Sequence, residues 1–140
     1  MVAKNYIADG YTEDGLINAI PNMHGPVRFQ YRVMLSDKIR ELIHAWDMIS
    51  AAERTRRTHA VIIKQVVSWD LVKEDPKTGE ETPLPITAES LTRLKRNIVE
   101  RLFNIVMQLE TTDEETKPEE DLDLDKLLSD KPTEEEDAKN

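Results

Sequence analysis

The feature that most constrains the fold is the uneven distribution of charge along the chain. Residues 110–140 carry 14 acidic side chains against 4 lysines, whereas residues 1–109 carry 15 basic and 14 acidic side chains. The net charge of −9 therefore belongs to the C-terminal stretch, and the rest of the chain is close to neutral. Only the part ahead of residue 110 has a composition that can form a core.

The C-terminal stretch has too little apolar surface to fold alone. Its large apolar side chains are Leu122, Leu124, Leu127 and Leu128. Their burial would contribute roughly 6–12 kcal/mol at best, whereas ordering the backbone costs at least about 1 kcal/mol per residue. We therefore expect one compact domain over residues 1–110 and a disordered acidic tail over residues 111–140.

Three of these leucines form a helical pattern inside the tail. Leu124, Leu127 and Leu128 follow at steps of three and four, so they would share one face of a short helix. This spacing favours a peptide that docks into a groove. The alternative is a solvated tail in which the leucines are incidental. If the tail binds the partner, deleting residues 111–140 should leave the fold intact and abolish partner capture.

The clearest strand pattern covers residues 27–35, where apolar side chains alternate with polar or flexible ones. The core-facing positions are Val27, Phe29, Tyr31, Val33 and Leu35. Upstream, Leu16–Ile20 favours a second short strand, although a helical turn also fits this segment. The N-terminal part is therefore expected to hold short strands.

Two helical patterns follow. Ser36 is the expected N-cap of the first helix, whose apolar stripe is Ile39, Leu42, Ile43, Trp46 and Ile49. The stripe fades at the polar residues 53–57. The next segment is expected to be a helix that runs into a short strand at Trp69–Val72, because β-branched residues accumulate there.

A last helix is expected after an exposed turn at residues 74–81 and an extended arm at residues 83–86. Thr87 is its expected N-cap. The core stripe consists of Leu91, Leu94, Ile98, Leu102, Ile105 and Leu109, and is widened by Val99, Phe103 and Val106. A helix this apolar contacts two neighbours, either within the domain or across an interface with a second copy.

These patterns predict an α+β domain that is mostly helical. Short N-terminal strands would be followed by two to three helices, with a small hairpin or extended loop before the last helix.

No pattern of catalytic or metal-binding residues is present. The chain has no cysteine, its three histidines do not form a ligand pair, and its four glycines form no phosphate-binding loop. Asp121, Asp123 and Asp125 resemble the start of a calcium loop, but Lys126 and Pro132 occupy the positions that need glycine and glutamate. We therefore expect a protein that is not an enzyme and binds neither cofactor nor metal.

Nucleic acid and membrane are poor candidates as partners. Arg54, Arg56 and Arg57 form a basic cluster, and the last helix carries further basic residues, but the charge balance of residues 1–109 favours an ordinary solvated surface. No apolar run is long enough to span a membrane, and the first residues lack the pattern of a signal peptide. The expected location is the cytoplasm.

Protein partners remain as the expected binding targets. Trp46 and Trp69 both lie in apolar stripes, where they either pack in the core or form an exposed hot spot. The apolar positions late in the last helix and the tail leucines are the other candidates. The predicted partner-binding residues are thus Trp46, Trp69, Leu102, Phe103, Val106, Leu124, Leu127 and Leu128.

Two stretches resemble a known family. Residues 29–32 fit an F-x-Y-R pattern ahead of a helix. Residues 66–71 fit V-x-x-W-D-L, followed by an acidic turn with Gly79, and residues 85–91 fit P-(I/L)-T-x-E-x-L. Together they resemble the tail assembly chaperones of long-tailed bacteriophages over residues 6–109. These are packing and turn motifs that carry no chemistry of their own.

The resemblance implies a protein-binding factor that acts in the cytoplasm of a bacterial host cell. Such chaperones bind the tape measure protein, keep its helical segments soluble and help recruit tail tube subunits. Two alternatives stay open. One is a structural virion protein, such as a small tail or head–tail joining subunit. The other is a nucleic-acid-linked regulator or inhibitor with an acidic tail, which would bind with a steep dependence on salt.

Overall fold

A computed structural model describes residues 5–115 of the chain. In chain order the elements are β1 (Glu13–Ile17), β2 (Val27–Tyr31), α1 (Ser36–Ile43), the 3₁₀ turn η1 (Trp46–Met48), α2 (Ala51–Gln65), β3 (Val66–Trp69), β4 (Val72–Glu74), β5 (Glu81–Pro83), α3 (Ala88–Arg93) and α4 (Arg96–Val106).

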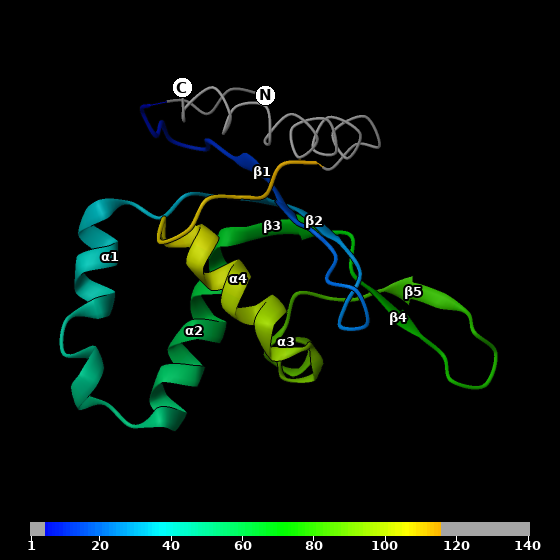
Figure 1. Ribbon diagram of the computed structural model, residues 1–140. Coiled ribbons are helices and arrows are strands. Elements are labelled where there is room, and N and C mark those ends of the chain that lie inside the picture. Colours follow the sequence, from blue (N-terminus) through cyan, green and yellow to red (C-terminus); the bar gives the residue numbers. More distant parts are fainter. Residues whose placement is uncertain (1–4, 116–140) are drawn as a thin grey trace, which may run out of the picture.

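The core lies between one three-stranded antiparallel sheet and the helices on one side of it (Figure 1). The strand order is β1-β2-β3, with Gly15 opposite Phe29 and Phe29 opposite Trp69. Val27, Phe29 and Tyr31 are buried, as their alternation with polar residues predicts. They pack in one cluster with side chains of α2, α3 and α4, of which the most deeply buried are Ile62, Leu91, Leu102 and Val106.

The expectation of a mostly helical chain with its strands ahead of its helices is wrong. Helices account for 39% and strands for 20% of the structure, in two small antiparallel sheets. β3 follows α2 in the sequence and returns to pair with β2, while β4 and β5 form a separate hairpin. The hairpin of β1 and β2 would be only marginally stable alone. The β-branched residues at 66–67 therefore form a third strand beside β2 rather than extending α2.

Several element boundaries also differ from those expected. The polar residues 53–57 lie within the first turns of α2 and do not interrupt it. The helix begins ahead of them because Ser50 caps its start, accepting a hydrogen bond from the backbone N–H of Glu53 at 3.1 Å. Ser36 forms no side-chain cap at the start of α1. The expected last helix is divided into α3 and α4 by Leu94 and Lys95, which have extended backbone angles. Thr87 caps α3, as the sequence predicts.

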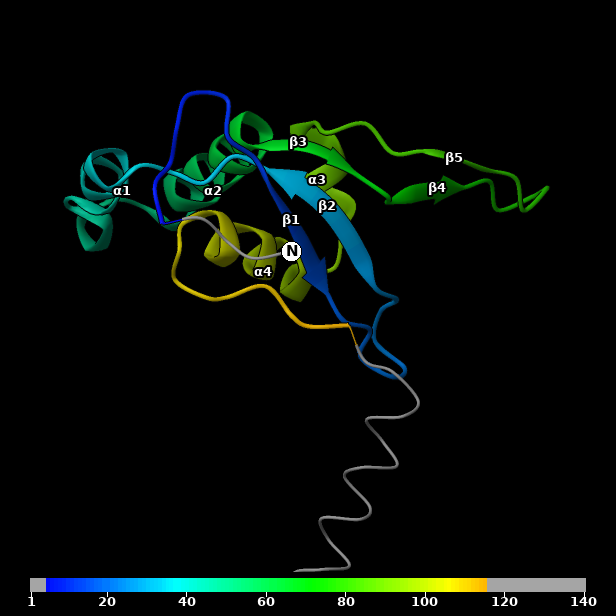
Figure 2. The same ribbon diagram turned by 90° about the horizontal axis from the view of Figure 1, so that it is seen from above.

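Two elements project from opposite ends of the molecule. Figures 1 and 2 show α1 at one end and the β4–β5 hairpin at the other. None of the α1 residues is buried, and every residue of both hairpin strands is exposed. The body between them carries the core, so these projecting elements are available for other contacts.

The described C-terminal residues, 111–115, run beside the edge strand β1, and we call them the C-terminal strap. The backbone N–H of Asp113 donates to the carbonyl of Leu16 at 2.9 Å, and the hydroxyl of Thr112 accepts from the N–H of Leu16 at 2.5 Å. Asp113 also pairs with Arg101 at 2.6 Å. The rest of the predicted tail, residues 116–140, lies outside the described residues.

Candidate protein-binding groove

The candidate site begins with α1, a helix that packs against the core but contributes no fully buried residue to it. Its apolar residues Ile39 and Leu42 are only half-buried, and Ile43 is 50% exposed. Just before the helix, Leu35 is 48% exposed. The helix ends at Ile43, and Ala45, which adopts a left-handed conformation with φ 59°, turns the chain into η1. The apolar side of α1 therefore lacks full cover within the described structure.

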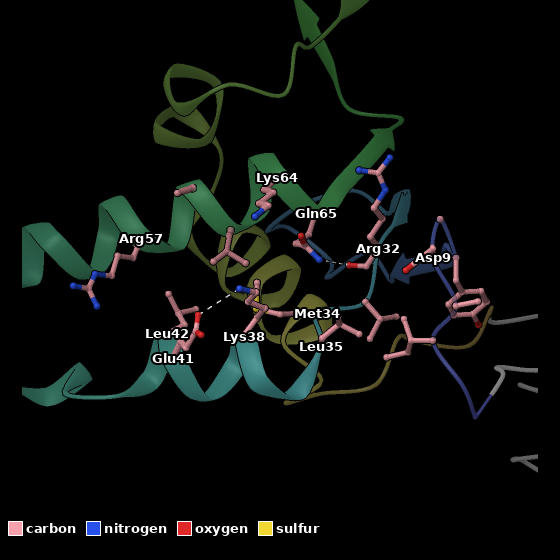
Figure 3. Close-up of a pocket in the computed structure, with 17 residues that line it drawn as sticks. Asp9, Arg32, Met34, Leu35, Lys38, Glu41, Leu42, Arg57, Lys64 and Gln65 are labelled. Atoms are coloured by element: carbon pink, nitrogen blue, oxygen red, sulfur yellow. Dashed lines mark hydrogen bonds and ion pairs between the residues drawn. The ribbon is translucent and has the colours of Figure 1, made fainter.

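A groove of about 620 Å³ separates α1 from α2. Figure 3 shows the two helices facing one another across it. Its floor includes the buried residues Val33, Met34 and Val61 together with Ala60 and Leu42. Residues 7–11, which precede β1, also line the groove. The floor is thus apolar, as a site for apolar side chains requires.

The rim of the groove carries four basic side chains, Arg32, Lys38, Arg57 and Lys64, against the two acids Asp9 and Glu41. Lys38 lies 3.7 Å from Glu41 in an exposed ion pair of small energetic value. Within residues 5–115, Arg32 and Lys64 have no ion-pair partner. The rim therefore offers unpaired positive charge beside an apolar floor. Figure 3 shows Lys64 on α2, whereas the guanidinium of Arg32 extends past the end of α2 toward β3.

The backbone at the base of the rim is held in place. The N–H of Arg32 donates to the carbonyl of Gln65 at 2.7 Å, and the side chain of Gln65 donates to the carbonyl of Arg32 at 2.9 Å. At the next turn of the chain, the carbonyl of Met34 accepts from the Gln108 side chain at 2.8 Å. These bonds link the end of β2 to both α2 and the end of α4, so the floor is preorganised.

The arginine cluster that follows η1 is engaged in contacts within the protein. Hydrogen bonds from Arg56 and Arg57, and the charge of both, lower the pKa of Glu53 from 4.5 to about 2. Arg54 donates to the backbone carbonyls of Trp46 and Asp47 at 2.9 and 3.1 Å. Arg54 therefore fastens η1 to α2, whereas Arg56 and Arg57 form ion pairs within α2.

Trp46 links η1 to α4. Its ring stacks on Phe103 of α4, with the centroids 6.0 Å apart and the planes at 24°. Both side chains are half-buried. The two predicted partner-binding residues thus contact each other, and each leaves part of its ring exposed near η1.

The other predicted partner-binding residues do not join this pair. Trp69 is half-buried and its indole N–H donates to the carbonyl of Leu84 at 2.7 Å, next to the hairpin. Leu102 and Val106 are both 0% exposed and belong to the core. The tail leucines, Leu124, Leu127 and Leu128, lie outside the described residues.

The rim residues Arg32, Lys38 and Lys64 are absent from the residues predicted on sequence alone. Arg32 was available as an outward-facing residue of the alternating strand, and Lys64 as a polar position of a helix. No local pattern indicates that these two and residues 7–11 meet, because the contact depends on how α1 turns back beside α2.

A second, smaller cavity of about 310 Å³ lies between the β1–β2 connection and α4 and is lined mostly by polar residues. It includes His24, whose Nε2 atom is buried without a hydrogen-bond partner among the described residues. Arg101 at its edge is already paired: burial lowers the pKa of this guanidinium, but Glu110 and Asp113 outweigh that effect and raise it. Little charge is left there to hold a ligand.

Within residues 5–115, no group of three or more histidine or acidic side chains is placed to hold a metal ion. Nor does any helix of this part of the chain have the length and apolar character needed to cross a bilayer. Comparisons with protein families, with curated proteins and with solved structures find no match to this chain.

Proposed function

We propose that the protein is a non-enzymatic binding factor that holds an amphipathic helix of another protein in the groove between α1 and α2. The single observation that carries the proposal is the groove itself, in which an apolar floor lies beside the unpaired basic residues Arg32 and Lys64. An amphipathic helix enters such a groove with its apolar stripe on the floor. Acidic residues flanking that stripe would meet the basic rim and favour correct orientation.

Exposed apolar side chains at the edge of the groove and beyond it support a partner larger than a small molecule. Leu35 and Ile43 are about half exposed, and Met48 is 85% exposed. Methionine suits a surface that adapts to helical partners, because its side chain is flexible and polarizable. A partner helix along α1 would cover this row as well as the groove.

The resemblance of the sequence gives this proposal its specific form. We propose that the protein is a bacteriophage tail assembly chaperone, acting in the cytoplasm of the bacterial host. Its groove would bind helical segments of the tape measure protein and so help recruit tail tube subunits. Long helical proteins supply repeated amphipathic segments, which is the type of ligand that the groove fits.

The experiment is an affinity pull-down of the full chain from its native lysate at low and moderate salt, read by mass spectrometry. The test variant is Arg32→Glu/Lys64→Glu, which reverses the two unpaired charges of the rim. The matched control is Lys73→Glu/Lys77→Glu, which makes the same charge change on exposed residues of the hairpin at the opposite end. We expect the wild type and the control to recover a long helical protein together with tube subunits.

The rim variant should recover that partner at least about tenfold less well, equivalent to about 1.4 kcal/mol. Equal recovery by the rim variant and the wild type would contradict binding in the groove. Stable incorporation of the chain into finished particles would favour the structural virion protein instead. Recovery of nucleic acid that is lost as salt rises would favour the regulator.

A further inference from the structure

We infer that the groove between α1 and α2 has an occupant within the same chain, the acidic leucine-containing segment 119–128. The inference rests on the proposed function only in naming the partner that the segment would displace. Docking of the segment itself depends on the groove, on charge and on reach. The consequence is a binding factor whose own C-terminal segment competes with the partner for the same surface.

The charge of the segment is complementary to the rim. Residues 119–128 read Glu-Glu-Asp-Leu-Asp-Leu-Asp-Lys-Leu-Leu, which gives five acidic side chains against one lysine. The rim has four basic side chains against two acidic ones, and Arg32 and Lys64 have no ion-pair partner among the described residues. Both unpaired charges could be neutralised by one acidic segment, while the remaining rim pairs are kept.

The apolar residues of the segment match the floor. Leu124, Leu127 and Leu128 have the spacing of one helical face. In the groove, that face would cover Met34, Ala60 and neighbouring apolar side chains. The segment therefore has the features of an amphipathic ligand, with leucines for the floor and carboxylates for the rim.

The chain leaves the described structure within reach of the groove. Glu115, the last described residue, forms an ion pair with Arg28 at 2.5 Å. Arg28 lies four residues before the rim residue Arg32, about 13 Å along an extended strand. Leu124 is nine residues beyond Glu115, a span of up to about 30–32 Å when extended. The segment can therefore reach the groove without detaching the C-terminal strap.

Attachment to the same chain makes this occupant effective. A tethered ligand acts at an effective concentration of order 1 mM. A segment that binds with a dissociation constant near 0.1 mM would then fill about 90% of the grooves and weaken partner binding roughly tenfold. A partner that binds more tightly would still displace it, so the segment sets a threshold for binding.

The first experiment locates the segment on the full chain by paramagnetic relaxation in NMR. Because the protein has no cysteine, a nitroxide placed at Ser129→Cys is the only label on the chain. We expect loss of the amide signals of groove residues such as Met34, Ala60 and Lys64. Signal loss confined to Arg28 and β1, or spread evenly over the surface, would overturn the inference.

A variant in the segment tests whether its leucines hold it in the groove. Leu124→Ser/Leu127→Ser/Leu128→Ser in the labelled full chain should restore the groove signals, because the apolar contact is removed. The matched control, Glu134→Gln/Glu135→Gln/Glu136→Gln, changes three residues past the segment and should leave the signal loss in place. A mixing experiment separates docking within one chain from docking between two copies: nitroxide-labelled chains without ¹⁵N are mixed with ¹⁵N chains that carry no label. Loss of groove signals in this mixture would assign the contact to a second copy and overturn docking within one chain.

Partner capture separates this inference from the proposed function. If the segment competes, the triple serine variant should bind the captured partner about tenfold more tightly than the full wild-type chain. Because reversing the rim charges would also release the segment, Arg32→Glu/Lys64→Glu is compared in the triple serine background. If the segment docks but the rim change in that background still captures the partner normally, the inference holds and the proposed function fails. If the rim variant loses the partner while the label gives no signal loss at the groove, the proposed function holds and the inference fails.

Discussion

At the residue scale, a glycine in β1 leaves room for an aromatic ring of the core. Gly15 of β1 is buried opposite Phe29, and a Cβ atom built on it would lie 2.3 Å from the end of the phenyl ring. The ring itself is 5% exposed and packs against Tyr31, with the centroids 5.3 Å apart. The absence of a side chain at Gly15 is therefore what allows the Phe29 ring to pack directly against β1.

Gly15→Ala should lower the free energy of unfolding by about 1–3 kcal/mol, because the added methyl group forces the buried ring to move. Urea unfolding followed by fluorescence measures the change. Gly25→Ala is the control, since a Cβ at Gly25 meets nothing within 4 Å, and it should lose no more than about 0.5 kcal/mol. Equal losses of stability for both substitutions would show that the contact with Phe29 is not the cause of the loss at Gly15.

Also at the residue scale, the ion pairs of Glu53 make stability depend on pH. Hydrogen bonds from Arg56 and Arg57 lower the pKa of Glu53 from 4.5 to about 2. A carboxyl whose pKa is lowered by folding stabilises the folded state at pH values above its unfolded pKa. That contribution is lost as the pH falls toward the folded pKa.

Glu53→Gln should therefore be less stable than the wild type at neutral pH, and the difference should narrow as the pH falls from 4.5 to about 2. The measurement is urea unfolding at a series of pH values. Glu80→Gln is the control, because it removes one negative charge from an exposed hairpin residue without an ion pair in the described structure. Its stability relative to the wild type should not change in this way with pH. A difference between wild type and Glu53→Gln that stays constant over this range would contradict the assignment.

At the element scale, the ends of the helices decide where the groove forms. α2 starts at a capped residue, Ser50, directly after η1, whereas α1 starts after Leu35 with no side-chain cap. The capped helix packs Val61 and Ile62 into the core, and the uncapped one buries no residue. The groove therefore has one firmly held wall and one that tertiary contacts hold weakly.

Ser50→Ala should lower the free energy of unfolding by about 1 kcal/mol, since the N–H of Glu53 loses its partner. Ser36→Ala should change it by less than about 0.5 kcal/mol, because Ser36 makes no cap. Thermal unfolding of both variants beside the wild type checks the pair. A larger loss for Ser36→Ala would show that α1, rather than α2, is the helix stabilised by a serine cap.

At the scale of the whole molecule, the C-terminal strap joins the last described residues to the edge strand β1. Thr112 and Asp113 satisfy backbone groups of Leu16 and Asn18 at the edge of β1. The strap thus covers an edge that would otherwise be open to pairing with another chain. It also holds residue 115 at β2, where the rest of the C-terminal stretch begins.

Deletion of residues 111–140 should therefore lower the free energy of unfolding by about 2–4 kcal/mol, at roughly 1 kcal/mol for each hydrogen bond lost. This result would differ from the intact fold expected on sequence alone. Deletion of residues 116–140 keeps the strap and removes only the docking of segment 119–128, so it should lower the free energy of unfolding by no more than about 1.4 kcal/mol. Melting of the two truncated chains, followed by circular dichroism, measures the contribution of the strap. Identical melting curves would contradict a stabilising strap.

Much of the local structure follows from the sequence. The alternation at Val27, Phe29 and Tyr31 predicted a strand with one buried face, and Thr87 was predicted to cap a helix. Both signals depend on the residues themselves and their near neighbours. The same is true of the charge division at residue 110, which needs only composition.

The remaining features depend on contacts between distant residues. The pairing of β3 with β2 was missed because a β-branched run fits a helix end or a strand equally well until a partner strand is present. The break between α3 and α4 leaves the apolar spacing almost unchanged, so periodicity does not reveal it. By itself, the sequence determined the buried strand face and the acidic C-terminal stretch. Only the tertiary structure decided the groove, because Arg32, Lys38 and Lys64 meet through the folding of α1 beside α2.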